Sequence, residues 1–447
     1  MENENKLGVM PITKLIWNMS LPIIASMLVQ ALYNIVDSVF VSRVSEQALT
    51  AVSLAFPAQN LMIGLATGTA VGVNALMGRA LGAGQRERAD KVANHGILLA
   101  LVGFVISALL GATCSDLFFR SQTQIENIIR MGNDYLRVVT IGSLGMFCQI
   151  MYERLLQGTG RSILSMYTQG LGAIINIILD PIFIFTLNMG VTGAAVATII
   201  GQFCGCALAI YFNHKKNTDI TLSIKGFRPD FRLIGEIYAI GLPSVIMIAI
   251  GSVMTFLMNK ILITYHSARE TAATAFGIYF KLNSFVFMPI FGLNNGMIPI
   301  IGYNYGARKK DRLLEASRLS TRYAVMIMTV GMLLFWVIPN VFLGIFDASD
   351  KMLAIGIPAL RIISVGFPLA GYAIMKGSVF QALGKSIYSM NISIIRQLVV
   401  LLPAAFLLSR LGEVTYVWLA FPIAEIVGLT FSIIYSRKIH REMIDVL

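Results

Sequence analysis

The feature that most constrains this chain is a series of long apolar runs separated by short charged or Gly/Pro-rich breaks. Each run approaches or exceeds the ~20 residues that an α-helix needs to cross the hydrocarbon core of a bilayer. A helix satisfies its own backbone polar groups in lipid, so the pattern predicts a polytopic membrane protein with twelve transmembrane helices. The approximate limits of the runs are 15–41, 48–77, 93–117, 131–157, 164–186, 191–212, 233–263, 271–301, 317–343, 355–382, 388–409 and 414–435.

Composition excludes the main classes of soluble protein. Hydrophobic residues make up 56% of the chain and charged residues 13%, whereas soluble domains carry about 25% charged residues. The net charge of +12 would indicate nucleic-acid binding only if the bases gathered on one water-facing surface, but they are scattered between the apolar runs. The sequence contains no phosphate-binding loop, G-x-S-x-G elbow or close histidine pair. We therefore expect no nucleic-acid partner, no cofactor and no enzymatic activity.

Lysine and arginine are distributed unevenly between the two sides of the membrane that twelve spans define. Twenty bases of the connecting segments lie on the side of the N-terminus and six lie on the other side. Loops rich in positive charge are retained in the cytoplasm. Because an even number of spans returns the chain to its starting side, both termini are predicted to be cytoplasmic.

The chain contains an internal repeat, because one constant offset in numbering aligns three separated segments of its two halves. This repeat offset aligns EQALTAVSLAF at 46–56 with ETAATAFGIYF at 270–280, GRALGAGQRER at 78–88 with GYNYGARKKDR at 302–312, and QGTGRSILSM at 157–166 with QALGKSIYSM at 381–390. Six spans in each copy give the copies the same orientation, so a pseudo-two-fold axis along the membrane normal should relate them. We predict an all-α fold of two six-helix lobes, an N-lobe at 1–212 and a C-lobe at 233–447, joined by a polar linker at 213–232.

These features resemble the prokaryotic branch of the MATE family, the multidrug and toxic compound extrusion transporters. The resemblance is carried by the first span, SLPIIASMLVQALYNIVDSVFVS, by the basic loops GRALGAGQRER and GYNYGARKKDR, and by NIILDPIF of the fifth span. It covers nearly the whole chain. It implies secondary-active antiport in a bacterial or archaeal cytoplasmic membrane, where inward movement of Na⁺ or H⁺ drives an organic substrate outward.

Acidic side chains are rare within the predicted spans. An ionisable group in a span costs at least ~2.5 kcal/mol to insert, so each one is a candidate functional residue. Asp37 and Asp180 lie near the outer ends of spans one and five, and Thr198 of span six reaches the same depth. Helical spacing places further polar residues on the same faces and so predicts three polar stripes. Gln30 and Asn34 extend the stripe of Asp37, Gln169 and Asn176 that of Asp180, and Gln202 that of Thr198. We expect the stripes to converge inside the N-lobe, where their oxygens suit Na⁺ and the carboxylates suit a proton.

The family resemblance makes this expectation more specific. Asp37, Asn176, Asp180 and Thr198 occupy the positions that form the family's N-lobe cation site, so the resemblance assigns the coupling ion, Na⁺ or H⁺, to these four residues. Polar residues in spans also hold helices together. For the supporting residues of the stripes, that structural role stays open.

The C-lobe has a different set of polar residues. The repeat offset places Val400 and Ala404 at the positions of Asn176 and Asp180. The polar residues that lie well inside its spans are mostly bases: Lys260, Lys281, Lys376 and Arg396. These bases either line a substrate cavity or serve as structural partners, and Glu425, the only deep acid of this lobe, is a candidate partner for Arg396. In the N-lobe, Glu153 and Arg154 lie near the inner end of span four, where we expect an inner-gate or interface contact.

The sequence therefore predicts a monomeric antiporter in a lipid membrane that exports small amphiphilic organic compounds. The basic C-lobe makes a zwitterionic or anionic compound as reasonable a substrate as a cationic one. The alternative is a lipid-linked saccharide flippase of the same superfamily, which would require a basic central cavity and depend less on Asp37 and Asp180.

Overall fold

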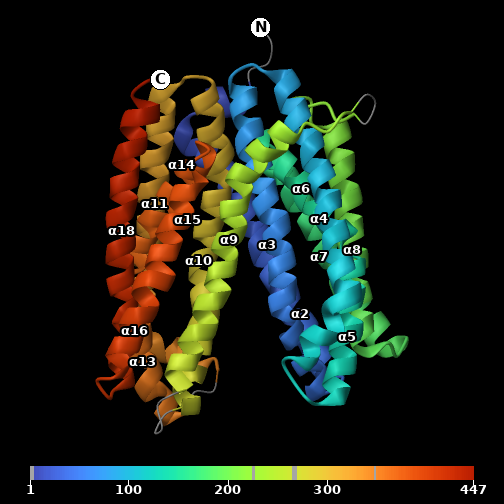
Figure 1. The fold of residues 1–447 in the computed structure, drawn as a ribbon, viewed down its shortest axis with the longest axis vertical. Helices are drawn as coiled ribbons and strands as arrows, with labels where there is room; N and C mark the ends of the chain where they lie inside the picture. Colours follow the sequence, from blue (N-terminus) through green and yellow to red (C-terminus); the bar gives the residue numbers. More distant parts are fainter. Residues whose placement is uncertain (1–4, 224–226, 264–268, 347–348) are drawn as a thin grey trace.

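The chain folds into two helical lobes, which stand side by side in the computed structural model (Figure 1). The structure describes residues 5–223, 227–263, 269–346 and 349–447. The N-lobe contains α1 (Lys6–Val9), α2 (Ile12–Ser42), α3 (Glu46–Gly82), α4 (Arg86–Arg120), α5 (Glu126–Ile141), α6 (Leu144–Gly158), α7 (Ser162–Pro181), the π-helical turn η1 (Ile182–Thr186) and α8 (Gly190–Lys215). The C-lobe contains α9 (Phe231–Ile263), α10 (Arg269–Gly306), α11 (Lys310–Val337), α12 (Pro339–Gly344), α13 (Asp350–Ser364), α14 (Phe367–Ala382), α15 (Ser386–Ile394), η2 (Ile395–Leu401), α16 (Leu402–Ser409), α17 (Val414–Trp418), α18 (Ala420–Ile439) and η3 (His440–Ile444).

Large apolar side chains cover the outside of the lobes, where a soluble protein would be polar. On α4, for example, Val105, Ile106, Leu109 and Leu110 are 46% to 60% exposed. Exposed apolar residues in this number mark a surface that contacts a membrane or another protein. The exposed faces therefore agree with the prediction of a membrane protein.

The helices account for the twelve predicted spans. Within the described residues, ten helices are long and apolar enough to cross a membrane, and the pair α13 and α14, bent by 48°, makes an eleventh. The pair α5 and α6 is the N-lobe equivalent of α13 and α14, because the repeat offset carries the first residue of α5, Glu126, onto the first residue of α13, Asp350. Charged residues such as Glu126, Glu153 and Arg154 lower the hydropathy of α5 and α6. This pair completes the set of twelve.

The internal repeat is reproduced in three dimensions. Four pairs of helices begin at residues that the repeat offset relates: α4 and α11, α5 and α13, α7 and α15, and α8 and α17. Helices α3 and α10, which are also equivalent, cross one another between the lobes. An added Cβ on Gly82 would lie 1.9 Å from the carbonyl oxygen of Tyr303, and one on Gly306 would lie 2.0 Å from that of Arg79. Gly82 corresponds to Gly306 and Arg79 to Tyr303, so the contact is reciprocal, as a two-fold axis requires.

Among the described residues, the closest backbone contacts between the lobes lie along the halves nearest the termini. There the backbones approach closely through glycine: a Cβ on Gly72 of α3 would lie 2.3 Å from the Ile237 oxygen of α9, and one on Gly296 of α10 would meet Ser20 of α2. At Gly251 and Gly277, toward the other ends of α9 and α10, a Cβ would meet nothing within 4 Å. The ribbons of the two lobes diverge in the same direction (Figure 1). We call the packed side the termini end and the other side the far end.

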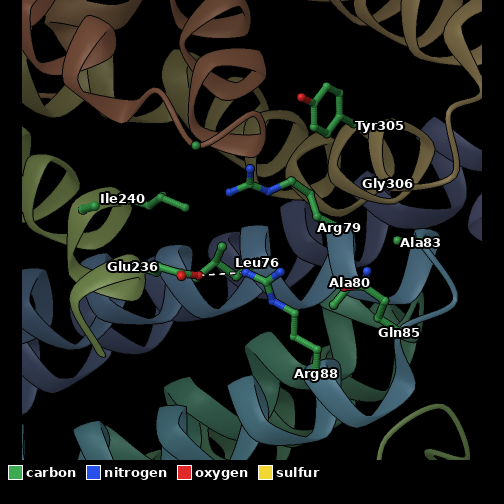
Figure 2. Close-up of a pocket in the computed structure, with 12 residues that line it drawn as sticks. Leu76, Arg79, Ala80, Ala83, Gln85, Arg88, Glu236, Ile240, Tyr305 and Gly306 are labelled. Atoms are coloured by element: carbon green, nitrogen blue, oxygen red, sulfur yellow. Dashed lines mark hydrogen bonds and ion pairs between the residues drawn. The ribbon is translucent and has the colours of Figure 1, made fainter. Parts of the chain in front are cut away.

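Polar contacts across the lobes reinforce the termini end. A cavity of about 490 Å³ lies at this junction, and two of its lining residues, Arg88 of α4 and Glu236 of α9, form a 2.8 Å ion pair. Figure 2 shows these residues facing each other. The segment at 5–10 also bridges the lobes. Asn5 donates to the carbonyl of Thr159 in the N-lobe (3.0 Å), while Arg312 of the C-lobe donates to the carbonyl of Met10 (2.7 Å). Closure of this end therefore involves helix packing, an ion pair and the N-terminal segment.

Candidate cation site in the N-lobe

Three helices of the N-lobe bring the predicted cation residues together. Helices α7 and α8 approach closely through Gly172 and Gly201, each of which faces the backbone oxygen of the other. This approach sets Asn176 of α7 beside Thr198 of α8, and the Asn176 amide donates to the Thr198 hydroxyl at 3.2 Å. The same amide lies 3.5 Å from Oδ1 of Asp180, one helical turn further along. Helix α2 packs against α7 and contributes Asp37.

These residues are enclosed by the lobe. Asp180 is fully buried, Asn176 is 2% exposed and Asp37 is 9% exposed. Asp37 on α2 and Asp180 on α7 are buried between packed helices, so their negative charges repel one another when both carboxyls are ionised. Within the described residues no lysine or arginine pairs with either carboxylate. Two like charges thus share a region shielded from water.

In the part of the chain that the structure describes, three buried oxygens of this group have no hydrogen-bond donor. They are Oδ1 of Asp37, Oδ1 of Asn176 and Oδ2 of Asp180. A buried acceptor without a partner is costly, and native structures rarely leave one unexplained. Carboxylate and amide oxygens are the ligands that hard cations prefer. The donor set therefore fits Na⁺, and a proton on one carboxyl would equally relieve the repulsion.

The backbone next to the site is irregular. Helix α7 ends at Pro181, directly after Asp180, and continues into the π-helical turn η1. Proline has no N–H, so the carbonyl of Ile177 lacks its helical donor. Irregular backbone at membrane depth is tolerated where it lines a site inside the protein. This carbonyl, of the residue that follows Asn176 and lies three residues before Asp180, is a further oxygen available beside the site.

A small cavity of about 100 Å³ extends from the site into the N-lobe. Most of the predicted polar stripes converge here, since Gln30, Gln169 and Gln202 line this cavity together with Asn176 and Thr198. Asn34 does not, because its side chain lies on the exposed face of α2. Helical spacing placed Asn34 near Asp37 but did not determine whether its side chain would face the lobe interior or the outside. The cavity also contains residues that the stripes did not include, among them Tyr33 and Gln149.

Glu153 is located differently from the expectation. It is 3% exposed, lines the N-lobe cavity, and accepts hydrogen bonds from Gln149 (2.9 Å) and Thr168 (2.8 Å). The expectation of an inner-gate or interface contact was wrong, because depth along span four was considered without its helical face. Gln149 and Glu153, four residues apart, were the available signal. The neighbouring Arg154 donates to Gln157 at 3.0 Å.

The four C-lobe bases do not form a common group. Arg396 donates from one nitrogen to both oxygens of Glu425, at 3.0 and 3.2 Å, which confirms the predicted pair. Lys260 is exposed, lies 5.0 Å from the ring centroid of Phe256 and lines a groove with Arg410, whereas Lys376 lines a separate pocket inside the C-lobe. Lys281 is exposed and lies 5.9 Å from the ring of Phe346.

Similar proteins place the fold in a known context. The multidrug export protein MepA of Staphylococcus haemolyticus is 27% identical over 431 residues, which are 96% of this chain and 94% of that protein. A MOP superfamily transporter from Pyrococcus furiosus, described as having a binding pocket of reversed polarity, superposes with a TM-score of 0.92 at 27% identity over 98% of both chains. A multidrug resistance MATE family transporter in an outward-facing conformation superposes with a TM-score of 0.91, also at 27% identity over 98% of both chains.

The match to the family itself extends over both lobes. The sequence profile of the MatE family fits residues 22–182 and 243–407, which together exceed half of the chain and include both Asp37 and Asp180. The two segments begin at Pro22 and Pro243, the equivalent prolines of the two repeats. The chain belongs to the MatE family.

Proposed function

We propose that this protein is a secondary-active efflux antiporter in which inward movement of Na⁺ or H⁺ drives the export of amphiphilic organic compounds. The observation that carries the proposal is the group of three unpartnered buried oxygens on Asp37, Asn176 and Asp180. These oxygens, with the hydroxyl of Thr198, would hold the cation. The names of the MepA relatives, which are multidrug export proteins, support the substrate class.

The like charges of Asp37 and Asp180 supply the coupling. When both carboxyls are ionised in their shielded position, they repel each other and favour capture of a cation or proton. The N-lobe cavity begins at Asn176 and Thr198 and holds a third acid, Glu153. A bound coupling ion and a substrate in this region would therefore alter each other's affinity, which is the requirement for exchange.

The packing of the lobes supports alternating access. The termini end is closed by the α3–α10 crossing, while the lobes diverge at the far end (Figure 1). The match to a transporter solved in an outward-facing conformation supports the same state for this chain. We propose that both termini lie in the cytoplasm, that the far end opens to the outside, and that the transporter works as a monomer in the bacterial or archaeal cytoplasmic membrane.

The charge of the substrate is the less constrained part of the proposal. The N-lobe cavity is acidic, whereas the C-lobe carries Lys260 and Arg410 in an apolar groove of about 890 Å³. This groove is the observation that favours the second candidate, a lipid-linked saccharide flippase, because its two bases could hold a phosphate beside an acyl chain. Reversed pocket polarity in the Pyrococcus furiosus neighbour gives a precedent for altered substrate charge in this fold.

The test is dye uptake into proteoliposomes under an imposed Na⁺ or proton gradient, with cationic, zwitterionic and anionic dyes. We expect one gradient to stimulate uptake, and we expect Asp37→Asn and Asp180→Asn to abolish that stimulation. Asp116→Asn is the matched control, because Asp116 is an exposed acid that pairs with Arg120 at the surface. Undiminished gradient dependence in both site variants would show that the cation binds elsewhere. Transport of a lipid-linked saccharide without gradient dependence would favour the flippase.

A binding measurement separates ion capture from transport. A ligand that binds only the folded protein at 100 times its Kd stabilises it by about 2.7 kcal/mol. If Na⁺ is the coupling ion, NaCl should raise the unfolding temperature of the wild-type protein more than an equal concentration of choline chloride. Asp180→Asn should lose that difference and Asp116→Asn should keep it.

A further inference from the structure

A second polar pocket lies entirely within the C-lobe, near the termini end. Its volume is about 260 Å³. Helices α11 and α18 each pack on α14, and side chains of all three helices line the pocket. All three helices run to the termini end, close to the C-terminus (Figure 1). The polar lining residues are Ser317, Arg318 and Thr321 of α11, Tyr372 and Lys376 of α14, Ser436 of α18 and His440 of η3.

The pocket contains positive charge without a matching carboxylate. Lys376 is half-buried, donates to the Ser317 hydroxyl at 3.2 Å and lies 5.4 Å from the centroid of the Tyr372 ring. Arg318, at the exposed edge of the pocket, is close enough to Lys376 to repel it. Among the described residues neither base has an ion-pair partner. Two neighbouring positive charges, one of them half-buried, favour the binding of an anion.

The acids of the surrounding segments do not supply that anion. Asp445 is 3.1 Å from Lys310 and 3.4 Å from His440, and it does not line the pocket. Glu442 lies 4.0 Å from Lys438. Glu315, one turn before Arg318, is exposed and also lies outside the lining. The basic lining residues are therefore Lys376, Arg318 and His440, and among the described residues no carboxylate lines the pocket.

Further donors complement the two bases. Tyr372 and Ser436, which carry hydroxyl donors, line the pocket, whereas the Thr321 hydroxyl donates to the Ser317 carbonyl at 2.6 Å. Ammonium, guanidinium and hydroxyl donors around one space are the usual partners of phosphate oxygens. The remaining walls are apolar, with Val379 and Phe380 among the lining side chains. They leave room for the carbon chain of a phosphate ester.

The repeat provides an internal comparison. The repeat offset places Tyr152 at the position of Lys376, Asn94 at that of Arg318, Cys148 at that of Tyr372 and Phe212 at that of Ser436. Asn94 is engaged by the interlobe linker, since its side-chain oxygen accepts from the Ser223 amide at 3.1 Å. The N-lobe therefore has no basic residue at these positions. The basic pocket is a property of the C-lobe sequence and not a consequence of the fold.

We propose that this pocket binds a phosphate-bearing anion between α11 and α18. The phosphate comes either from the headgroup of an anionic lipid in the leaflet at the termini end or from a soluble phosphate ester. Basic pockets between transmembrane helices on the cytoplasmic side are known sites for anionic headgroups. Binding would neutralise Lys376 and Arg318 and would link α11 and α18, which both pack on α14.

The experiment uses the full-length purified protein, first in neutral detergent and then in nanodiscs. Thermal unfolding is measured with phosphatidylglycerol, with phosphatidylcholine, with inorganic phosphate and with glycerol phosphate. We expect a stabilisation that saturates with phosphatidylglycerol or with the soluble phosphates and that is absent with phosphatidylcholine. Saturation by phosphatidylglycerol alone identifies a lipid headgroup, and saturation by the soluble phosphates identifies a soluble ester. No stabilisation by any phosphate anion overturns the proposal.

Variants decide whether the effect belongs to this pocket. Lys376→Gln and Arg318→Gln should each weaken the apparent affinity about tenfold or more, because each removes a charge-assisted hydrogen bond to the anion. Lys376→Arg keeps the charge and should retain binding. Lys281→Gln is the matched control, because Lys281 is an exposed base of the same lobe that also lies over an aromatic ring. Equal affinities in Lys376→Gln, Arg318→Gln and the control would place the anion elsewhere and overturn the assignment.

Discussion

The glycine crossing of α3 and α10 allows a quantitative test of how the lobes close. Adding a methyl group at Gly82 would set its carbon 1.9 Å from the Tyr303 oxygen, whereas ordinary contact begins at 3.4 Å. The obstructing atom belongs to the backbone, so the helices themselves must separate. Overpacking of this kind costs about 1–3 kcal/mol. Gly82→Ala should therefore lower the ratio of the state closed at the termini end to the state open there by about five- to 150-fold, at tenfold for each 1.4 kcal/mol.

Paired spin labels at the far end provide the assay. Val44, which follows α2, and Leu411, which follows α16, are exposed residues of opposite lobes. With both replaced by labelled cysteines in a background without the four native cysteines, pulsed electron spin resonance measures the separation of the lobes. We expect Gly82→Ala to shift the distribution toward shorter distances, because the far end should close as the termini end opens. Gradient-driven dye uptake should fall in parallel.

Two other glycines serve as controls for this substitution. Gly251→Ala and Gly277→Ala make the same chemical change in long helices of the C-lobe, at positions where a Cβ meets nothing within 4 Å. Both should match the wild-type protein in distance distribution and uptake. If Gly82→Ala also matches the wild-type protein, the α3–α10 crossing does not control closure. Gly306→Ala, the symmetry equivalent, should behave like Gly82→Ala.

Two further predictions concern buried charges. Glu153 accepts hydrogen bonds from two neutral donors, and Glu153→Gln keeps the size of its side chain but removes its charge. Uptake of cationic dyes should therefore fall more than uptake of anionic dyes. Equal effects on both kinds of dye would exclude a role of Glu153 in selecting substrate charge. Arg396→Leu leaves the half-buried Glu425 without its cation and should destabilise the protein in chemical unfolding, by up to about 3–5 kcal/mol. Combining Arg396→Leu with Glu425→Leu should recover most of that loss. Failure of the double variant to recover would mean that the pair does more than neutralise charge.

The architecture could be predicted from the sequence because the repeat is preserved in the connections as well as in the spans. The turns that end α6 and α14 contain Gly160 and Gly384, with φ of +87° and +75°, and the repeat offset makes these two glycines equivalent. Gly84 has φ of +71°, and its equivalent, Arg308, adopts φ of +55° without a glycine. In both repeats, a residue with positive φ lies two residues before the start of a helix, α4 and α7 in the N-lobe and α11 and α15 in the C-lobe. The registers of the two lobes are therefore linked even where their apolar residues differ.

The site was harder to predict, because helical spacing determines a stripe but not its direction. Asp37 and Asn34 are three residues apart on α2, yet Asp37 is buried and Asn34 is exposed. The face of α2 that is buried depends on which helix packs against it. That helix is α7, which is distant in the sequence, so the contact could not be read from the spacing within α2. The same limit explains Glu153, whose cavity is formed by residues of several helices. For the C-lobe bases, position within a span gave no information about their separate pockets.

The cation site and the contact between the lobes share one helix. Helix α2 carries Asp37 near its far end, and nearer its start it carries Ser20 and Ile24, which pack on Gly296 and Gly292 of α10. Pro22 lies between these two contact residues and is buried. A proline inside a helix removes a backbone hydrogen bond and makes a bend at that point less costly. In the proposed antiport, a change of charge at Asp37 would therefore bend α2 near Pro22, where this helix contacts the other lobe. No contact between the substrate and the α3–α10 crossing is then required for the ion to influence closure.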